Sequence, residues 1–102
     1  MIMRRNEVIA RLKQTEPTLS ASGIAALYLF GSHARDEASS ESDIDIFIDP
    51  TSESEFGFLP FMNTYEALRE AFGRQVEIGY STCAGLSPYV RHAVEREAVR
   101  IF

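Results

Sequence analysis

The stretch LYLFGSHARDEASSESDIDIFID, residues 27–49, decides the fold of this chain. It opens inside a continuous apolar run, Ile24 to Phe30, whose length predicts a strand buried on both faces. It closes with residues 43–49, where isoleucine occupies every second position. That period of two predicts a second strand with one apolar face and one charged face.

A glycine and a polar bridge connect the two predicted strands. Gly31 ends the first apolar run, and residues 33–41 are polar and rich in serine and alanine. Such a composition predicts a short helical turn followed by a loop. The stretch therefore indicates a strand, a turn and a second strand in immediate succession.

Apolar residues at helical spacing predict three helices outside this unit. The first runs from Arg4 to about Glu16, ahead of Pro17 and an SASG turn; the second ends at Gly73; the third begins at Pro88. Their apolar stripes are Val8, Ile9 and Leu12; Phe61, Tyr65, Leu68 and Phe72; and Val90 and Val94. Core packing explains all three stripes.

Two further strands are predicted, the alternating segment QVEIGY at 75–80 and a short one within the closing AVRIF at 98–102. The chain has 102 residues, of which 45% are hydrophobic, a size and composition typical of one soluble domain. We therefore expect a single domain over 1–102 with an α/β (α+β) fold. The expected architecture is a small mixed sheet with flanking helices, packed on one face.

Charge and cysteine content limit the classes of function. A formal charge of −5 argues against a nucleic-acid groove and favours basic partners or metal ions. The single cysteine, Cys83, excludes an internal disulfide and indicates a free thiol in a reducing compartment. The start MIMRRNEVIA lacks a signal-peptide pattern, and no apolar run approaches the roughly 20 residues of a membrane span, so we expect a cytoplasmic protein.

Three carboxylates form the candidate metal and catalytic site. Asp43 and Asp45 lie on one face of a strand with their Cα atoms about 7 Å apart, where they repel unless a cation lies between them. Hard cations such as Mg²⁺ prefer such oxygen ligands. Glu77 would be a third ligand and a general base if its strand neighbours the first, as in a two-ion phosphoryl or nucleotidyl transfer. The alternative for each is an ordinary solvated strand face.

The turn between the strands is the candidate phosphate site. Gly31 allows a close backbone approach, and the Ser32 hydroxyl with adjacent N–H groups suits a terminal phosphate. Arg35 would add a charge to the triphosphate, hold the turn, or pair with Asp36 or Glu37. His33 reads as a turn residue rather than a ligand.

Together these residues resemble a known family. Gly31-Ser32, residues 33–42 and then Asp43-Ile44-Asp45 reproduce the signature of minimal nucleotidyltransferases (MNT) of the DNA polymerase beta superfamily. The resemblance implies a small mixed sheet, a phosphate-binding Ser32, and two Mg²⁺ or Mn²⁺ ions on the aspartates. It also implies ATP as substrate, because chains this short resemble antitoxins that transfer AMP to a tyrosine of a HEPN ribonuclease toxin.

Glu77 departs from the family pattern, in which the third carboxylate is usually aspartate. This departure leaves a second hypothesis open, a catalytically degenerate antitoxin that neutralises its partner by binding alone. A third hypothesis is a regulator that binds ATP without transferring it. Tyr80 is either a nucleoside contact or, more simply, a core residue.

Overall fold

The computed structural model describes residues 4–39, 43–52, 54–73, 76–82 and 88–102. Gln75, Cys83 and the side chain of Val90 lie outside this described part of the chain. The elements in chain order are α1 (Arg5–Gln14), α2 (Glu16–Ala21), β1 (Ile24–Phe30), α3 (Gly31–Ala34), β2 (Ile44–Pro50), α4 (Phe58–Phe72), β3 (Ile78–Thr82), α5 (Pro88–Glu97) and β4 (Val99–Arg100). The predicted order of helices and strands is confirmed, with α2 added.

The four strands form one mixed sheet in the order β3-β2-β1-β4. β1 pairs antiparallel with both β2 and β4, whereas β2 pairs parallel with β3. A parallel pair requires a long crossover, and α4 supplies it between β2 and β3. The predicted mixed sheet with flanking helices is confirmed.

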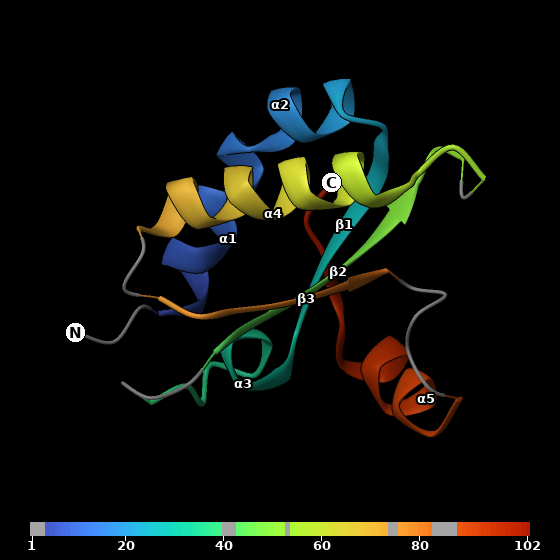
Figure 1. Cartoon of the computed structure of the whole chain (residues 1–102). Helices are drawn as coiled ribbons and strands as arrows, with labels where there is room; N and C mark the ends of the chain where they lie inside the picture. Colours follow the sequence, from blue (N-terminus) through green and yellow to red (C-terminus); the bar gives the residue numbers. More distant parts are fainter. Residues whose placement is uncertain (1–3, 40–42, 53, 74–75, 83–87) are drawn as a thin grey trace.

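Most of the core lies on one face of the sheet, under α1, α2 and α4 (Figure 1). Ile44, Ile46 and Ile48 point into this core and are fully buried, as their alternation predicts. The residues between them therefore point to the opposite face, and these include Asp45. The prediction of helices on one face alone is wrong, because Figure 1 shows α5 away from α1, α2 and α4, and its buried Val94 lies outside the main core cluster.

The first predicted helix differs most from the structure. The chain forms two helices there, because α1 ends at Gln14 and Pro17 occupies the first turn of α2. A proline is favourable at that position, since its missing N–H has no intrahelical partner there. Thr15 marks the break, and its hydroxyl donates to the Leu12 carbonyl at 2.6 Å. Pro17 therefore starts a second helix rather than following the end of the first.

Smaller differences concern element ends and burial. α4 begins at Phe58, three residues before its apolar stripe, and ends before Gly73 as predicted. β1 is less buried than its apolar run suggests, because Ala25 is exposed and Tyr28 is half-buried. Among the described helices, none is long and apolar enough to cross a membrane.

Candidate active site

Asp45 lies at the centre of the candidate site, on β2 between the end of β1 and the start of β3. It pairs with Phe30 across the antiparallel ladder and with Gly79 across the parallel one. A Cβ on Gly31 would overlap Asp45 Oδ2, and a Cβ on Gly79 would lie 2.6 Å from Asp45 Oδ1. The carboxylate therefore occupies space that exists only because both flanking residues are glycines.

The backbone conformation at Gly31 also favours glycine. Its φ of +76° lies in the left-handed region that side chains disfavour. This conformation turns the chain directly from β1 into α3, so that Ser32 follows at the edge of the Asp45 site. The turn predicted at Gly31 agrees with this geometry, whereas the close approach of its backbone to a phosphate stays a prediction.

Gly79 is a site residue that the sequence prediction missed. The signal was present, because a glycine inside an alternating strand often marks a close approach of another group. The alternation of residues 75–80 does not predict which strand they pair with, so it could not show that parallel pairing places Gly79 beside Asp45.

Asp43 immediately precedes β2 and is exposed. Its carbonyl oxygen lies 3.0 Å from Nδ1 of His33, a buried residue of α3. A carbonyl only accepts hydrogen bonds, so Nδ1 carries the proton in this contact. His33 thus joins the Gly-Ser turn to the aspartate strand, in keeping with its predicted structural role.

The ionisation of Asp45 is affected by its surroundings, including the neighbouring Asp43. Burial and the neighbouring Asp43 carboxylate together raise the pKa of Asp45, against weaker lowering by His33 and Arg35. A cation beside both carboxylates would remove this penalty, because it favours their charged forms. Oxygen donors with excess negative charge in a glycine-lined space fit a hard divalent cation.

Glu77 immediately precedes β3, which pairs parallel with β2, just as Asp43 immediately precedes β2. The Ile44 N–H donates to the Glu77 carbonyl at 2.9 Å, which fixes the two backbones next to each other. The Glu77 side chain is exposed. Within the described residues, no three Asp, Glu, His or Cys side chains converge closely enough to hold a metal. The sheet thus makes Glu77 a neighbour of the aspartates without forming a three-carboxylate cage.

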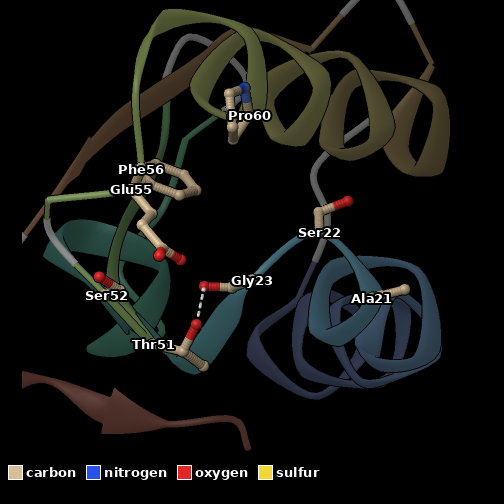
Figure 2. A pocket seen from close by; sticks show the side chains of 8 residues that line it. All are labelled: Ala21, Ser22, Gly23, Thr51, Ser52, Glu55, Phe56 and Pro60. Atoms are coloured by element: carbon tan, nitrogen blue, oxygen red, sulfur yellow. Dashed lines mark hydrogen bonds between the residues drawn. The ribbon is translucent and has the colours of Figure 1, made fainter.

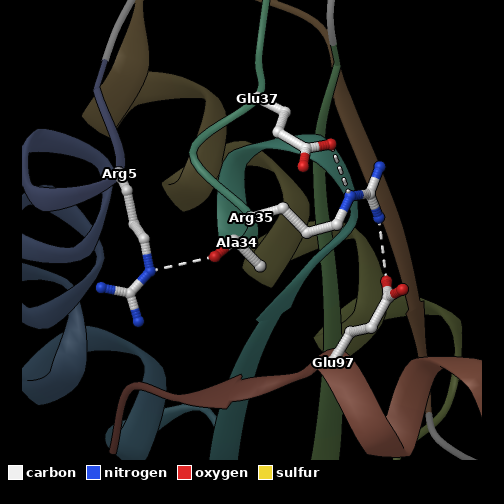
Figure 3. Close-up of polar contacts among 5 residues, drawn as sticks. All are labelled: Arg5, Ala34, Arg35, Glu37 and Glu97. Atoms are coloured by element: carbon white, nitrogen blue, oxygen red, sulfur yellow. Dashed lines mark hydrogen bonds and ion pairs between the residues drawn. The ribbon is translucent and has the colours of Figure 1, made fainter.

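Arg35 is held by carboxylates from two parts of the chain (Figure 3). Its Nε lies 3.2 Å from Glu37 Oε2, and its Nη1 lies 2.9 Å from Oε2 of Glu97 on α5. The predicted pairing with Glu37 is confirmed, whereas Asp36 pairs with Arg4 instead. Binding of the triphosphate by Arg35 stays a prediction.

The helix α1 holds the same turn from the other side. Arg5 Nε donates to the Ala34 carbonyl at 3.0 Å, as Figure 3 shows, and the Arg5 backbone N–H donates to Asp36 at 3.1 Å. Asp36 adopts φ +56°, an uncommon conformation that these contacts stabilise. The Gly-Ser turn is therefore fixed by α1 and α5 together.

Tyr80 belongs to the core and not to the candidate site. It lies on β3 one residue past Gly79, so it points to the opposite face. Its ring centroid lies 4.5 Å from that of Phe61 and 6.2 Å from that of Tyr65, both on α4. Burial raises the pKa of the Tyr80 hydroxyl to about 12. Core packing therefore accounts for Tyr80.

A mixed sheet that carries a Gly-Ser turn beside an Asp-Ile-Asp strand defines a nucleotidyltransferase fold. The chain belongs to the polymerase beta nucleotidyltransferase family, whose sequence model matches residues 11–102. The family resemblance predicted from the sequence is confirmed.

Individual relatives agree with this family. A candidate protein adenylyltransferase of Methanocaldococcus jannaschii is 28% identical over 78 residues, which cover 76% of this chain and 77% of the relative. The structure of a candidate minimal nucleotidyltransferase superposes with a TM-score of 0.79 at 29% identity, covering 95% of each chain.

Two more distant structures share the fold alone. A chain from a crystal structure of a toxin–antitoxin with AMP-PNP has a TM-score of 0.67 at 16% identity, covering 88% of this chain and 72% of its own. A candidate nucleotidyltransferase from Sulfolobus solfataricus has a TM-score of 0.55 at 18% identity, covering 94% and 80%.

Proposed function

We propose that residues 1–102 form a single minimal nucleotidyltransferase domain that acts in the cytoplasm as an antitoxin. In this proposal the chain transfers AMP from ATP to a hydroxyl of a partner protein, a tyrosine of a HEPN ribonuclease toxin. Family membership supports the nucleotidyl transfer, and the M. jannaschii relative supports a protein as acceptor. The structural likeness to a chain of a toxin–antitoxin motivates the choice of partner.

The observation that carries the proposal is the placement of Asp45. The Asp45 carboxylate lies in a confined space between two glycines and close to the Asp43 carboxylate. Burial and the charge of Asp43 raise the pKa of Asp45, so the ionised form of Asp45 is disfavoured there. Such a costly arrangement is expected where a cation is bound. Asp43 and Asp45 would hold Mg²⁺ or Mn²⁺, which would supply charge stabilisation for the transferring phosphoryl group.

The remaining residues divide the other tasks. Ser32 and the turn around Gly31 would bind the phosphates. Arg35 would add a positive charge once one of its two ion pairs with carboxylates breaks. The acceptor oxygen would form a bond to the α-phosphorus while the bond from that phosphorus to pyrophosphate breaks. Glu77 would take the proton of the acceptor hydroxyl, and pyrophosphate would leave as the second product.

The intact mass of the partner tests this proposal. The chain is incubated with ATP, Mg²⁺ and the protein encoded by the neighbouring gene, beside an Asp43→Asn control. We expect the partner to gain one or more AMP units with the wild-type chain and none with the control. An unmodified partner, or equal modification by the control, would refute the proposed mechanism.

A second candidate function is neutralisation by binding alone. The exposed side chain of Glu77, which does not converge with the aspartates, favours it. Under this alternative Asp43→Asn would still neutralise the toxin in cells. Glu77→Asp separates the two candidates further, because it would raise the rate of AMP transfer if the longer side chain hinders catalysis and would change nothing in a binding-only antitoxin.

A further inference from the structure

Two large apolar side chains remain exposed side by side at the start of α4. Phe58 is 75% exposed and Leu59 is 70% exposed, and among the described residues only Tyr89, on α5, is a comparable case. The segment that carries them is held by an aromatic contact, because Phe56 and Phe61 pack edge to face with ring centroids 6.5 Å apart. Exposed apolar side chains on a firm support are typical of protein contact surfaces.

A small cavity lies beside the same segment of the chain, because its lining includes Phe56 and Pro60, which flank this pair in the sequence. Its volume is about 240 Å³, and it lies between the end of α2, the end of β2 and the start of α4 (Figure 2). The lining residues are Ala21, Ser22, Gly23, Thr51, Ser52, Glu55, Phe56 and Pro60.

The polar lining of this cavity suits a cation. Glu55 contributes a carboxylate, which Figure 2 shows turned toward Gly23 and Thr51. The Gly23 carbonyl already accepts from the Thr51 N–H at 2.8 Å and from its hydroxyl at 3.3 Å. No lysine or arginine is among the lining residues, so a lysine or arginine side chain entering the cavity would meet acceptors and a negative charge.

The cavity lies far from the candidate active site. Gly23 precedes β1 and Thr51 follows β2, whereas Gly31 and Asp45 lie at the opposite ends of these two antiparallel strands. The seven residues of β1 separate Gly23 from Gly31, a distance of about 25 Å along the strand. The occupant of this surface is therefore not the nucleotide that the aspartates would process.

We propose that Phe58, Leu59 and the Glu55 cavity form the docking surface for the toxin partner, an inference that rests on the proposed function. The partner would cover the two apolar side chains and insert a lysine or arginine beside Glu55. Charge favours this occupant, because a ribonuclease needs basic residues to bind RNA and this chain carries a net charge of −5. A second copy of this chain would instead bring like charges together.

Matched variants test the surface. The double variant Phe58→Ser/Leu59→Ser removes the apolar contact, and its control is Tyr89→Ser, whose side chain is 92% exposed on α5. Glu55→Lys reverses the charge at the cavity, and its control is Glu7→Lys on the exposed side of α1. All five substitutions in these four variants alter exposed side chains, so unchanged melting temperatures are expected and verify folding.

The affinity for the neighbouring-gene protein is measured by titration calorimetry, together with kcat and KM for AMP transfer. We expect the double variant to weaken binding by about 30-fold or more, as loss of an interface hot spot does. Glu55→Lys should weaken binding in a salt-dependent manner, and both controls should stay near wild type. The surface variants should raise KM and leave kcat unchanged, whereas Asp43→Asn should bind normally without transfer.

Each remaining outcome overturns the inference in a distinguishable way. Wild-type affinity of both surface variants, with AMP transfer intact, would reject the docking surface and leave the proposed function standing. Loss of self-association in the double variant, with unchanged partner binding, would assign the surface to a second copy of this chain. A wild-type chain that neither binds nor modifies the partner would reject the proposed function and the inference with it.

Discussion

Gly79→Ala should separate the stability of the fold from the activity of the site. The new Cβ would lie 2.6 Å from Asp45 Oδ1, so the carboxylate must withdraw by about 0.8 Å to reach the ordinary contact distance of 3.4 Å. Asp45 would therefore have to turn or shift away from its present position beside Gly79. A displacement of about 1 Å at a reacting group can lower the rate about 100-fold.

The same substitution should change stability little. Alanine in place of a strand glycine gains about 0.5–1 kcal/mol from reduced freedom of the unfolded chain. A displaced Asp45 rotamer costs about 0.5–1.5 kcal/mol, so the two effects nearly cancel. For a domain of this size the melting temperature should therefore shift by less than about 4–8 °C.

The assay compares Mg²⁺-ATP affinity, AMP transfer and thermal melting for Gly79→Ala and Gly57→Ala. Gly57 is a suitable control for nucleotide binding, because a Cβ there would meet nothing within 4 Å. We expect normal melting of Gly79→Ala with weaker nucleotide binding and about 100-fold slower transfer. Wild-type transfer by Gly79→Ala would show that the position of Asp45 between the two glycines has no part in the chemistry.

Three further predictions follow from the contacts. Glu97→Gln frees one side of the Arg35 guanidinium, so ATP affinity measured by calorimetry should rise about twofold to fivefold while the melting temperature changes little, because the ion pair is exposed to solvent; weaker ATP binding would contradict a phosphate role for Arg35. Burial raises the pKa of Tyr80 from 10.0 to about 12, so wild-type stability should be lost as pH rises through this window, and Tyr80→Phe should abolish that loss in alkaline melting curves without changing ATP binding. Leu68→Ala removes a fully buried side chain and should lower the urea unfolding free energy by about 2–5 kcal/mol; a loss below about 1 kcal/mol would show a poorly packed core.

The strands and the Gly-Ser turn were predictable because their signals are local. Alternation over residues 43–49 specifies which side chains enter the core, and the isoleucines are buried accordingly. The helix break at Thr15 was harder to predict, because Pro17 fits equally after one helix or in the first turn of the next.

Contacts between distant segments could not be read from the pattern. Glu97 reaches Arg35 across 62 positions, and nothing in the helical spacing of α5 selects that partner. The parallel register that places Gly79 against Asp45 depends likewise on the crossover through α4. The Gly-Ser and Asp-Ile-Asp motif therefore predicts only part of the candidate site. The contacts made by Gly79 and Glu97 depend on tertiary packing.

The position of β3 at the edge of the sheet has a consequence for heat inactivation. β3 has five residues and, in the described sheet, its one neighbouring strand is β2, so it can detach in a local opening that costs less than global unfolding. Such an opening would remove Gly79 from Asp45 and Glu77 from Asp43 while the β1–β2 hairpin stays paired. On gradual warming, the chemistry should fail at a lower temperature than the fold, and amide exchange should be faster along β3 than along the central strands β1 and β2.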